Sequence, residues 1–64
     1  MRRHVGKVVK RQRLELDMSQ SELAVKIGTG QSYVSRLESS MHMPGYGMLL
    51  RLAKALRLEV GDFF

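Results

Sequence analysis

The sequence predicts an all-α fold, and three observations lead to this prediction. Apolar residues recur with helical spacing in several segments, helix-capping residues separate these segments, and no stretch of useful length alternates apolar and polar residues as a strand does. A chain of 64 residues has the length of one domain, which we expect to span residues 1–64. So small a domain buries only about 60% of the surface of its unfolded chain, so packed helices, a partner chain or both must stabilise it.

Two helices are predicted in the first half of the chain. The first runs from about residue 4 to 16 and is followed by a short connection at Asp17 and Met18. The second begins at Gln20, because the segment Ser19-Gln20-Ser21-Glu22 matches a capping box, in which a serine and a glutamate satisfy each other's free backbone N–H groups. Gly28 ends this helix, as glycine does at a left-handed C-terminal position. The residues with helical spacing in the first helix are Val5, Val8, Val9, Gln12, Arg13 and Leu16.

A third helix is predicted over residues 31–39, after a turn of three or four residues that contains Thr29 and Gly30. Two short helices joined by a glycine-containing turn of that length form a helix-turn-helix unit, here at about residues 20–27 and 31–39. Pro44, Gly45 and Gly47 then interrupt the chain. A fourth helix follows over Leu49 to Leu56, and residues 60–64 form a final single turn capped by Glu59 or Gly61.

The charge of the chain suits a polyanionic partner. Eleven Lys and Arg against six Asp and Glu give a net charge of +5. Such an excess fits nucleic acid or an anionic membrane, and it also fits a merely solvated helix face. There is no cysteine, which indicates a reducing compartment, and no apolar stretch approaches the roughly 20 residues that span a bilayer. We therefore expect a soluble, cytoplasmic protein.

The outward face of the third helix carries short hydrogen-bonding side chains. At 100° per residue, Val34 and Leu37 fall on one side, and Gln31, Ser32, Ser35 and Arg36 fall on the other, with Tyr33 at the border. The major groove of DNA admits a helix and presents donors and acceptors to such side chains. Glutamine pairs with adenine through both groups of its amide, and arginine pairs with guanine. An ordinary solvated face is the alternative.

The pattern resembles the phage-repressor and Cro-like regulators, also called the XRE family. Five blocks occur in the family's order and spacing, over nearly the whole chain. They are Ser19-Gln20-Ser21-Glu22-Leu23-Ala24, Gly28, Val34-Ser35-Arg36-Leu37-Glu38, Pro44 and Leu52-Ala53-Lys54-Ala55-Leu56. The resemblance implies a compact five-helix bundle of the lambda-repressor-like type whose third helix enters the major groove of double-stranded DNA. It also implies a homodimer on a palindromic site.

The resemblance also assigns roles to individual residues. Base contacts fall to Gln31, Ser32 and Arg36. Gln20 falls where the family contacts a phosphate and buttresses the recognition helix, and Arg13 with Glu38 matches a largely buried structural ion pair. The remaining contacts that we expect to the DNA backbone are those of Ser19, Tyr33, Ser35, Arg2, Arg3 and Lys10. Tyr33 has an equal alternative role as a cover for the core.

Three departures from the family pattern stand out. Serine occupies position 40, where the family usually has glycine, and a left-handed conformation there would cost roughly 1 kcal/mol. Arg57 likewise replaces a common glycine at the end of the fourth helix. The segment Met41-His42-Met43 stands where the family tends to be basic, so the usual phosphate contacts of that loop are in question.

Other functions have weaker support in the sequence. The two histidines, His4 and His42, have no carboxylate cluster beside them, so we expect neither an enzyme nor a cofactor or metal site. An antitoxin with a toxin partner, or another protein-interaction module, is the main alternative to a DNA-binding regulator, and a membrane-active basic peptide is a third. A further group of apolar residues either fills gaps in the core or forms a dimer surface; it consists of Met41, Met43, Met48, Leu14 and Phe64.

Overall fold

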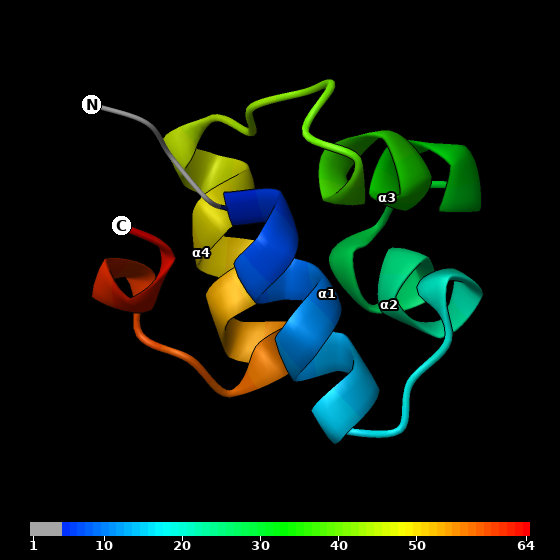
Figure 1. Ribbon diagram of the computed structural model, residues 1–64, viewed down its shortest axis with the longest axis horizontal. Coiled ribbons are helices and arrows are strands. Elements are labelled where there is room, and N and C mark those ends of the chain that lie inside the picture. Colours follow the sequence, from blue (N-terminus) through cyan, green and yellow to red (C-terminus); the bar gives the residue numbers. More distant parts are fainter. Residues whose placement is uncertain (1–4) are drawn as a thin grey trace.

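The computed structural model describes residues 5–64 and is entirely helical over that range (Figure 1). The helices are α1 (Val5–Glu15), α2 (Gln20–Ile27), α3 (Gln31–Glu38), α4 (Tyr46–Leu56) and the 3-10 helix η1 (Val60–Phe63). The predicted all-α class and the predicted helix-turn-helix at α2 and α3 are confirmed, with boundaries within about one residue of those expected.

Two expectations about the second half of the chain need correction. The resemblance implied five helices, whereas residues 5–64 form four α-helices. The final single turn expected over residues 60–64 is the 3-10 helix η1, because four residues are too few to close consecutive α-turns. Asp62 Oδ2 accepts a hydrogen bond from the backbone N–H of Glu59, which caps this turn. Helix α4 begins at Tyr46, so Gly47 lies inside it. The first turn of a helix lacks intrahelical partners for its N–H groups, which makes a glycine there less disruptive than in the helix interior.

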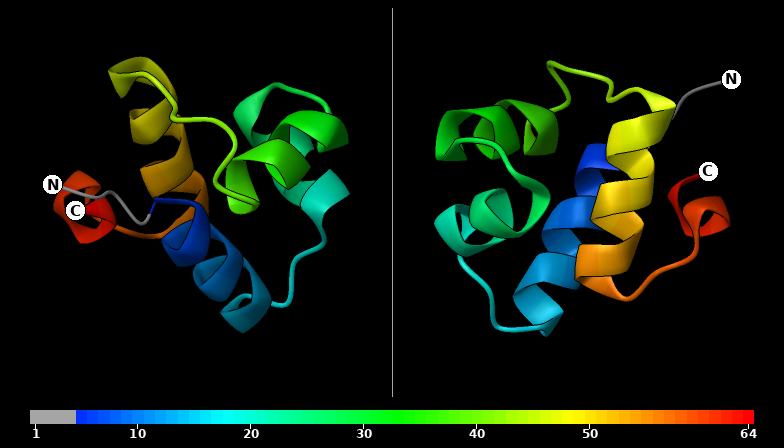
Figure 2. Two further views of the ribbon diagram at one scale, coloured as in Figure 1. Left: turned by 45° about the horizontal axis from the view of Figure 1, so that its top comes forward. Right: turned by 180° about the vertical axis from the view of Figure 1, so that it is seen from behind.

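The helices form two pairs around one core. Helices α1 and α4 lie side by side, and α2 and α3 form the second pair beside them, while the segment from α3 to α4 crosses from one pair to the other (Figures 1 and 2). The 3-10 helix returns the chain to α1 and α4 and inserts Phe63 into the core. The buried apolar side chains are Val5, Val9, Leu23, Ala24, Ile27, Val34, Leu37, Leu49, Leu52, Ala53, Leu56 and Phe63.

All four α-helices end in the same left-handed turn, although glycine occupies only one of these positions. Gly28 has φ 77°, whereas Asp17, Ser40 and Arg57 have φ 58°, 66° and 59°. At each end the next residue donates its N–H to the carbonyl five positions earlier, as Met41 does to Arg36 at 3.0 Å, which is the Schellman arrangement. The expected strain at Ser40 is therefore present, and Asp17 and Arg57 share it.

None of the helices within residues 5–64 has the length and apolar character needed to span a bilayer.

Candidate nucleic-acid interface

The N-terminus of α2 is capped by two side chains of its own first turn, those of Ser19 and Glu22. Ser19 Oγ accepts a hydrogen bond from the N–H of Glu22 at 3.0 Å, and Glu22 Oε1 accepts one from the N–H of Ser19 at 2.7 Å, so the predicted capping box is confirmed. The hydrogen bond that the backbone N–H of Ser19 donates to Glu22 Oε1 holds the pKa of the Glu22 carboxyl below its usual range, because it favours the charged form, and the Ser19 side chain adds to this effect. Ser19 is exposed.

The turn between α2 and α3 depends on Gly28. Its left-handed backbone reverses the chain direction, and Thr29 donates to the carbonyl of Ala24 at 2.9 Å. Gly30 then takes an extended conformation, and α3 begins at the next residue. This three-residue connection fixes α3 across α2 and turns one face of α3 to solvent.

The exposed face of α3 is the predicted polar one. Val34 and Leu37 are fully buried, whereas Gln31, Ser32, Ser35 and Arg36 are exposed. The Arg36 guanidinium makes no hydrogen bond or ion pair with another side chain of residues 5–64. This face therefore presents an unpaired cation and several donors and acceptors. The base contacts of Gln31, Ser32 and Arg36 stay predictions.

A buried ion pair lies behind this face. Arg13 Nε donates to Glu38 Oε2 at 2.7 Å and Arg13 Nη2 donates to Glu38 Oε1 at 3.0 Å, and the two side chains are 8% and 4% exposed. Arg13 Nη1 also donates to the carbonyl of Met18 at 2.7 Å. The hydrogen bond with Glu38 raises the pKa of Arg13 against the opposing effect of burial. The pair ties α1 and the α1–α2 turn to the end of α3.

Two glutamines extend this pair to the surface. Gln20 Nε2 donates to Glu38 Oε1 at 3.1 Å, and Gln31 Nε2 donates to Gln20 Oε1 at 2.9 Å. Gln20 is half-buried at the start of α2, and Gln31 is exposed at the start of α3. Gln20 thus contacts the recognition helix at both ends, which agrees with its expected buttressing role. Its phosphate contact stays a prediction.

Tyr33 lies between the core and the surface. It is half-buried against the core, and its ring meets that of His42 edge-on, with centroids 4.9 Å apart and an interplanar angle of 71°. Burial raises the pKa of the phenol, and the nearby charge of Arg36 partly opposes this. The contact with His42 attaches the α3–α4 segment to α3. A further contact of Tyr33 with the DNA backbone stays a prediction.

Comparison with known proteins agrees with this geometry. A sequence model of the helix-turn-helix family matches residues 9–63. The chain belongs to this family. It is 37% identical over 57 residues to y4dL, an uncharacterized HTH-type transcriptional regulator of Sinorhizobium fredii (strain NBRC 101917 / NGR234). It is 34% identical over 61 residues to y4wC, another such regulator of the same strain. These matches cover 89% and 95% of this chain but 29% and 43% of the relatives, so the chain spans less than half their length.

Solved structures of helix-turn-helix proteins superpose closely on this one. SinR, the master regulator for biofilm formation, solved in complex with DNA, matches with a TM-score of 0.86 and 32% identity, covering 92% of this chain and 95% of the chain in that structure. The P22 c2 repressor, solved with a synthetic operator, matches with a TM-score of 0.89 and 27% identity, covering 94% of this chain and 91% of the chain in that structure. The restriction-modification controller protein C.AhdI of Aeromonas hydrophila matches with a TM-score of 0.88 and 30% identity, covering 95% of this chain and 92% of the chain in that structure. The resemblance to repressor and Cro-like regulators is confirmed.

The remaining predicted backbone contacts lie on different parts of this helix-turn-helix domain. Ser35 lies on the exposed face of α3, beside Arg36, and Lys10 is exposed on α1. Arg2 and Arg3 lie outside the described residues. The DNA-backbone roles of all four stay predictions.

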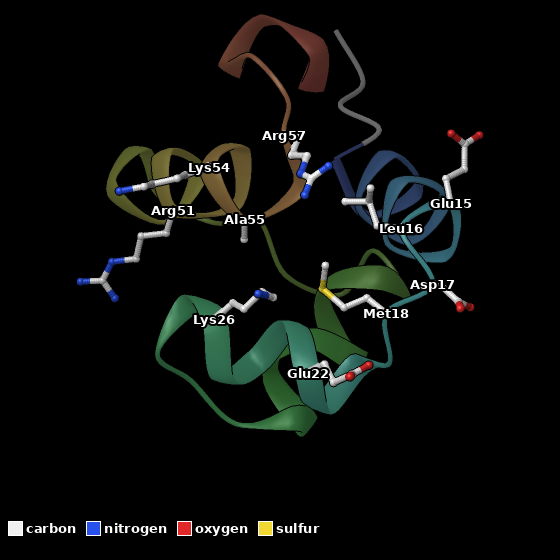
Figure 3. Close-up of a pocket in the computed structure, with 10 residues that line it drawn as sticks. All are labelled: Glu15, Leu16, Asp17, Met18, Glu22, Lys26, Arg51, Lys54, Ala55 and Arg57. Atoms are coloured by element: carbon white, nitrogen blue, oxygen red, sulfur yellow. The ribbon is translucent and has the colours of Figure 1, made fainter.

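A groove of about 910 Å³ lies on another part of the domain, between the end of α1, α2 and α4 (Figure 3). Its apolar lining consists of Leu16, Met18 and Ala55, whose side chains point into it (Figure 3). The acidic side chains lie along the margin near α1, and the basic side chains lie along the margin near α4 (Figure 3). The charged lining residues are Glu15, Asp17, Glu22, Lys26, Arg51, Lys54 and Arg57. None of the lining residues belongs to α3, so the groove is separate from the exposed face described above. Within residues 5–64 no three His, Asp or Glu side chains gather as metal ligands would.

Sequence reasoning missed the role of Gly6. This residue is buried in the first turn of α1, where a Cβ would overlap the carbonyl oxygen of Leu37 and lie 3.2 Å from that of Glu38. Helix α1 therefore approaches the backbone at the end of α3 more closely than any side chain permits. A glycine inside a predicted helix is the signal that could have pointed to such an approach.

Proposed function

We propose that this chain is a sequence-specific double-stranded DNA-binding transcriptional regulator that acts as a repressor, with α3 in the major groove. The observation that carries the proposal is the exposed face of α3. Arg36, unpaired within residues 5–64, and Gln31, which is hydrogen-bonded to Gln20, project there from a helix braced by the buried pair Arg13–Glu38. The relatives named as transcriptional regulators support this role over that of an antitoxin. The proposed role is binding, without a catalytic step.

Phosphate contacts and base contacts have separate tasks in this proposal. Exposed cations and the N-terminus of α2 at Ser19 and Gln20 hold the DNA backbone, which supplies affinity but no sequence information. Gln31, Ser32 and Arg36 contact base edges, and each bidentate pair contributes about 1–3 kcal/mol of discrimination. With about five phosphate contacts, the log–log salt slope of affinity is expected at about −4 to −5.

We also propose that two copies bind a palindromic site. The SinR and P22 c2 structures hold DNA, and dimers of such proteins contact half-sites about one helical turn apart. Met41, Met43 and Leu14 are exposed and could meet a partner copy, with exposures of 76%, 48% and 57%, and Phe64 is 62% exposed. Met48 packs against the core instead, so this residue fills a gap in the bundle.

Selection of bound sequences from a random duplex pool tests the proposal. The expected result is an enriched motif with two related half-sites, bound at least about 10³-fold more tightly than unrelated DNA. Arg36→Ala is expected to relax the preference at one base pair per half-site. Lys54→Ala removes the same charge from the groove margin on α4 and serves as the control that leaves base preference unchanged. A pool without an enriched motif, or an affinity independent of salt, would refute the proposal.

A further inference from the structure

The segment between α3 and α4 carries three neighbouring side chains with the donor atoms that soft metal ions prefer, those of Met41, His42 and Met43. All three residues are exposed, Met41 to 76% and Met43 to 48%. The other two methionines of residues 5–64, Met18 and Met48, pack against the core instead. The exposed thioethers of the described chain are therefore both in this one segment.

The backbone of the segment is held at both ends. The N–H of Met41 donates to the carbonyl of Arg36 at 3.0 Å, so the segment begins in the C-terminal turn of α3. Pro44 is buried directly after Met43. Between these points the chain forms no helix and crosses from α3 toward α4 at the margin of the bundle (Figure 1). The exposed side chains of Met41 and Met43 can therefore turn toward a ligand in solvent while the backbone stays in place.

The three donors are close enough to share one ion. The Cα atoms of Met41 and Met43 lie at most about 7 Å apart, because an extended chain advances about 3.3–3.6 Å per residue. A methionine side chain has three rotatable bonds, which lets both sulfur atoms reach a common point. His42 lies between them, and its ring meets that of Tyr33 edge-on with centroids 4.9 Å apart. An ion that binds both sulfur atoms is therefore within reach of an imidazole nitrogen as well.

The charge of the donors selects the kind of ion. The two thioethers and a neutral imidazole carry no charge, and the only carboxylate in the sequence between residues 23 and 58 is Glu38, which is paired with Arg13. Mg²⁺ and Ca²⁺ bind through oxygen ligands, above all carboxylates, and structural zinc sites use thiolates and several histidines. The lack of carboxylates beside His42 in the sequence thus argues against hard cations only. Thioether ligands favour Cu(I), and the chain has no cysteine that would compete for it.

We propose that Met41, His42 and Met43 form a binding site for Cu(I), with two thioether sulfur atoms and one imidazole nitrogen as the ligands. Cu(I) carries a single positive charge, and the segment lies in solvent, so neutral ligands are sufficient to hold it. The inference concerns the segment between α3 and α4 and does not depend on the proposed function.

Titration with Ag(I) followed by NMR tests the position of the site. Ag(I) has the charge of Cu(I) and its preference for sulfur, and it is not oxidised in air. We expect one ion per chain, with shifts of the methyl signals of Met41 and Met43 and of the ring signals of His42. The methyl signals of Met18 and Met48 are expected to stay in place, because these side chains pack against the core. Zn²⁺ is the comparison ion and is expected to leave all four methyl signals unchanged.

Competition for Cu(I) with the chelator bicinchoninate, without oxygen, measures the affinity of the site. Met41→Leu and Met43→Leu each remove a sulfur atom and keep an apolar side chain of similar volume, so the surface that a partner copy would meet is retained. Each variant is expected to weaken Cu(I) binding at least about tenfold. His42→Phe keeps an aromatic ring against Tyr33 without a nitrogen ligand, and a loss of similar size is expected. Met48→Leu is the matched control and is expected to bind Cu(I) like the wild type.

Several results would overturn the inference. Wild-type Cu(I) affinity in both Met41→Leu and Met43→Leu would show that the thioethers are not ligands. Equal shifts of the methionine methyl signals throughout residues 5–64, or failure of the wild type to hold Cu(I) against the chelator, would show that no defined Cu(I) site exists. The selection from random duplexes tests the proposed function in a separate experiment, so either can fail while the other holds.

Discussion

Replacement of Gly6 by alanine is expected to destabilise the domain, although alanine is normally the better residue in a helix. The added Cβ overlaps the carbonyl oxygen of Leu37 and lies 3.2 Å from that of Glu38. Both obstacles belong to the backbone of α3 and cannot rotate aside, so α1 must move away as a body. This movement loosens Val5 and Val9, which are 3% and 0% exposed in the core.

Two opposing effects set the magnitude. Overpacking of a close contact costs typically about 1–3 kcal/mol, whereas alanine gains up to about 1 kcal/mol over glycine in helix propensity. We therefore expect a net loss of about 1–2 kcal/mol in the free energy of unfolding. For a domain of this size, that loss lowers the melting temperature by roughly 5–15 °C.

Gly47→Ala is the matched control. Gly47 is likewise the second residue of its helix, but a Cβ there meets nothing within 4 Å. Its substitution is expected to raise stability by up to about 1 kcal/mol. Thermal and urea unfolding followed by circular dichroism measure both variants. If Gly6→Ala proves as stable as Gly47→Ala, the close approach of α1 to α3 does not constrain this position and the reasoning is wrong.

Three further predictions concern stability. Glu38→Ala is expected to cost about 3–5 kcal/mol and to unfold much of the protein, because it leaves a buried guanidinium without its partner; melting like the wild type would contradict this. Ser40→Gly and Arg57→Gly are each expected to raise the free energy of unfolding by about 1 kcal/mol, because glycine adopts the left-handed conformation without a Cβ clash. Urea titrations that show no gain in stability would argue against strain at these two helix ends. The pKa of Glu22 is lower in the folded state than in the unfolded one, so its stabilising contribution is complete above the ordinary pKa of a glutamate and is lost as the pH falls through the lowered value. Glu22→Gln keeps an acceptor for the Ser19 N–H without this titration, and its stability is expected to fall less steeply with acidification; an unchanged slope would show that Glu22 does not contribute to the pH dependence.

Local patterns in the sequence were sufficient for most of the fold. The capping box at Ser19 and Glu22, the glycine at position 28 and the helical spacing of Val34 and Leu37 define α2 and α3, because helix periods and caps depend on residues three or four positions apart. The same spacing assigned Gln31 and Arg36 to the exposed side of α3. The start of α4 was missed, because the glycines around Tyr46 resemble a loop when their capping context is not visible.

Only the tertiary structure decided the contacts between distant parts of the chain. The hydrogen bonds that join Glu38 to Gln20 and Gln20 to Gln31 link residues 18 and 11 positions apart, and the approach of Gly6 to Leu37 joins the first helix to the third. Periodicity states which side of a helix is apolar but does not state which atoms of another helix it meets. The sequence by itself therefore determined the helices and the polar face of α3, and the packing of α1 and α2 against α3 determined how the side chains on that face are held.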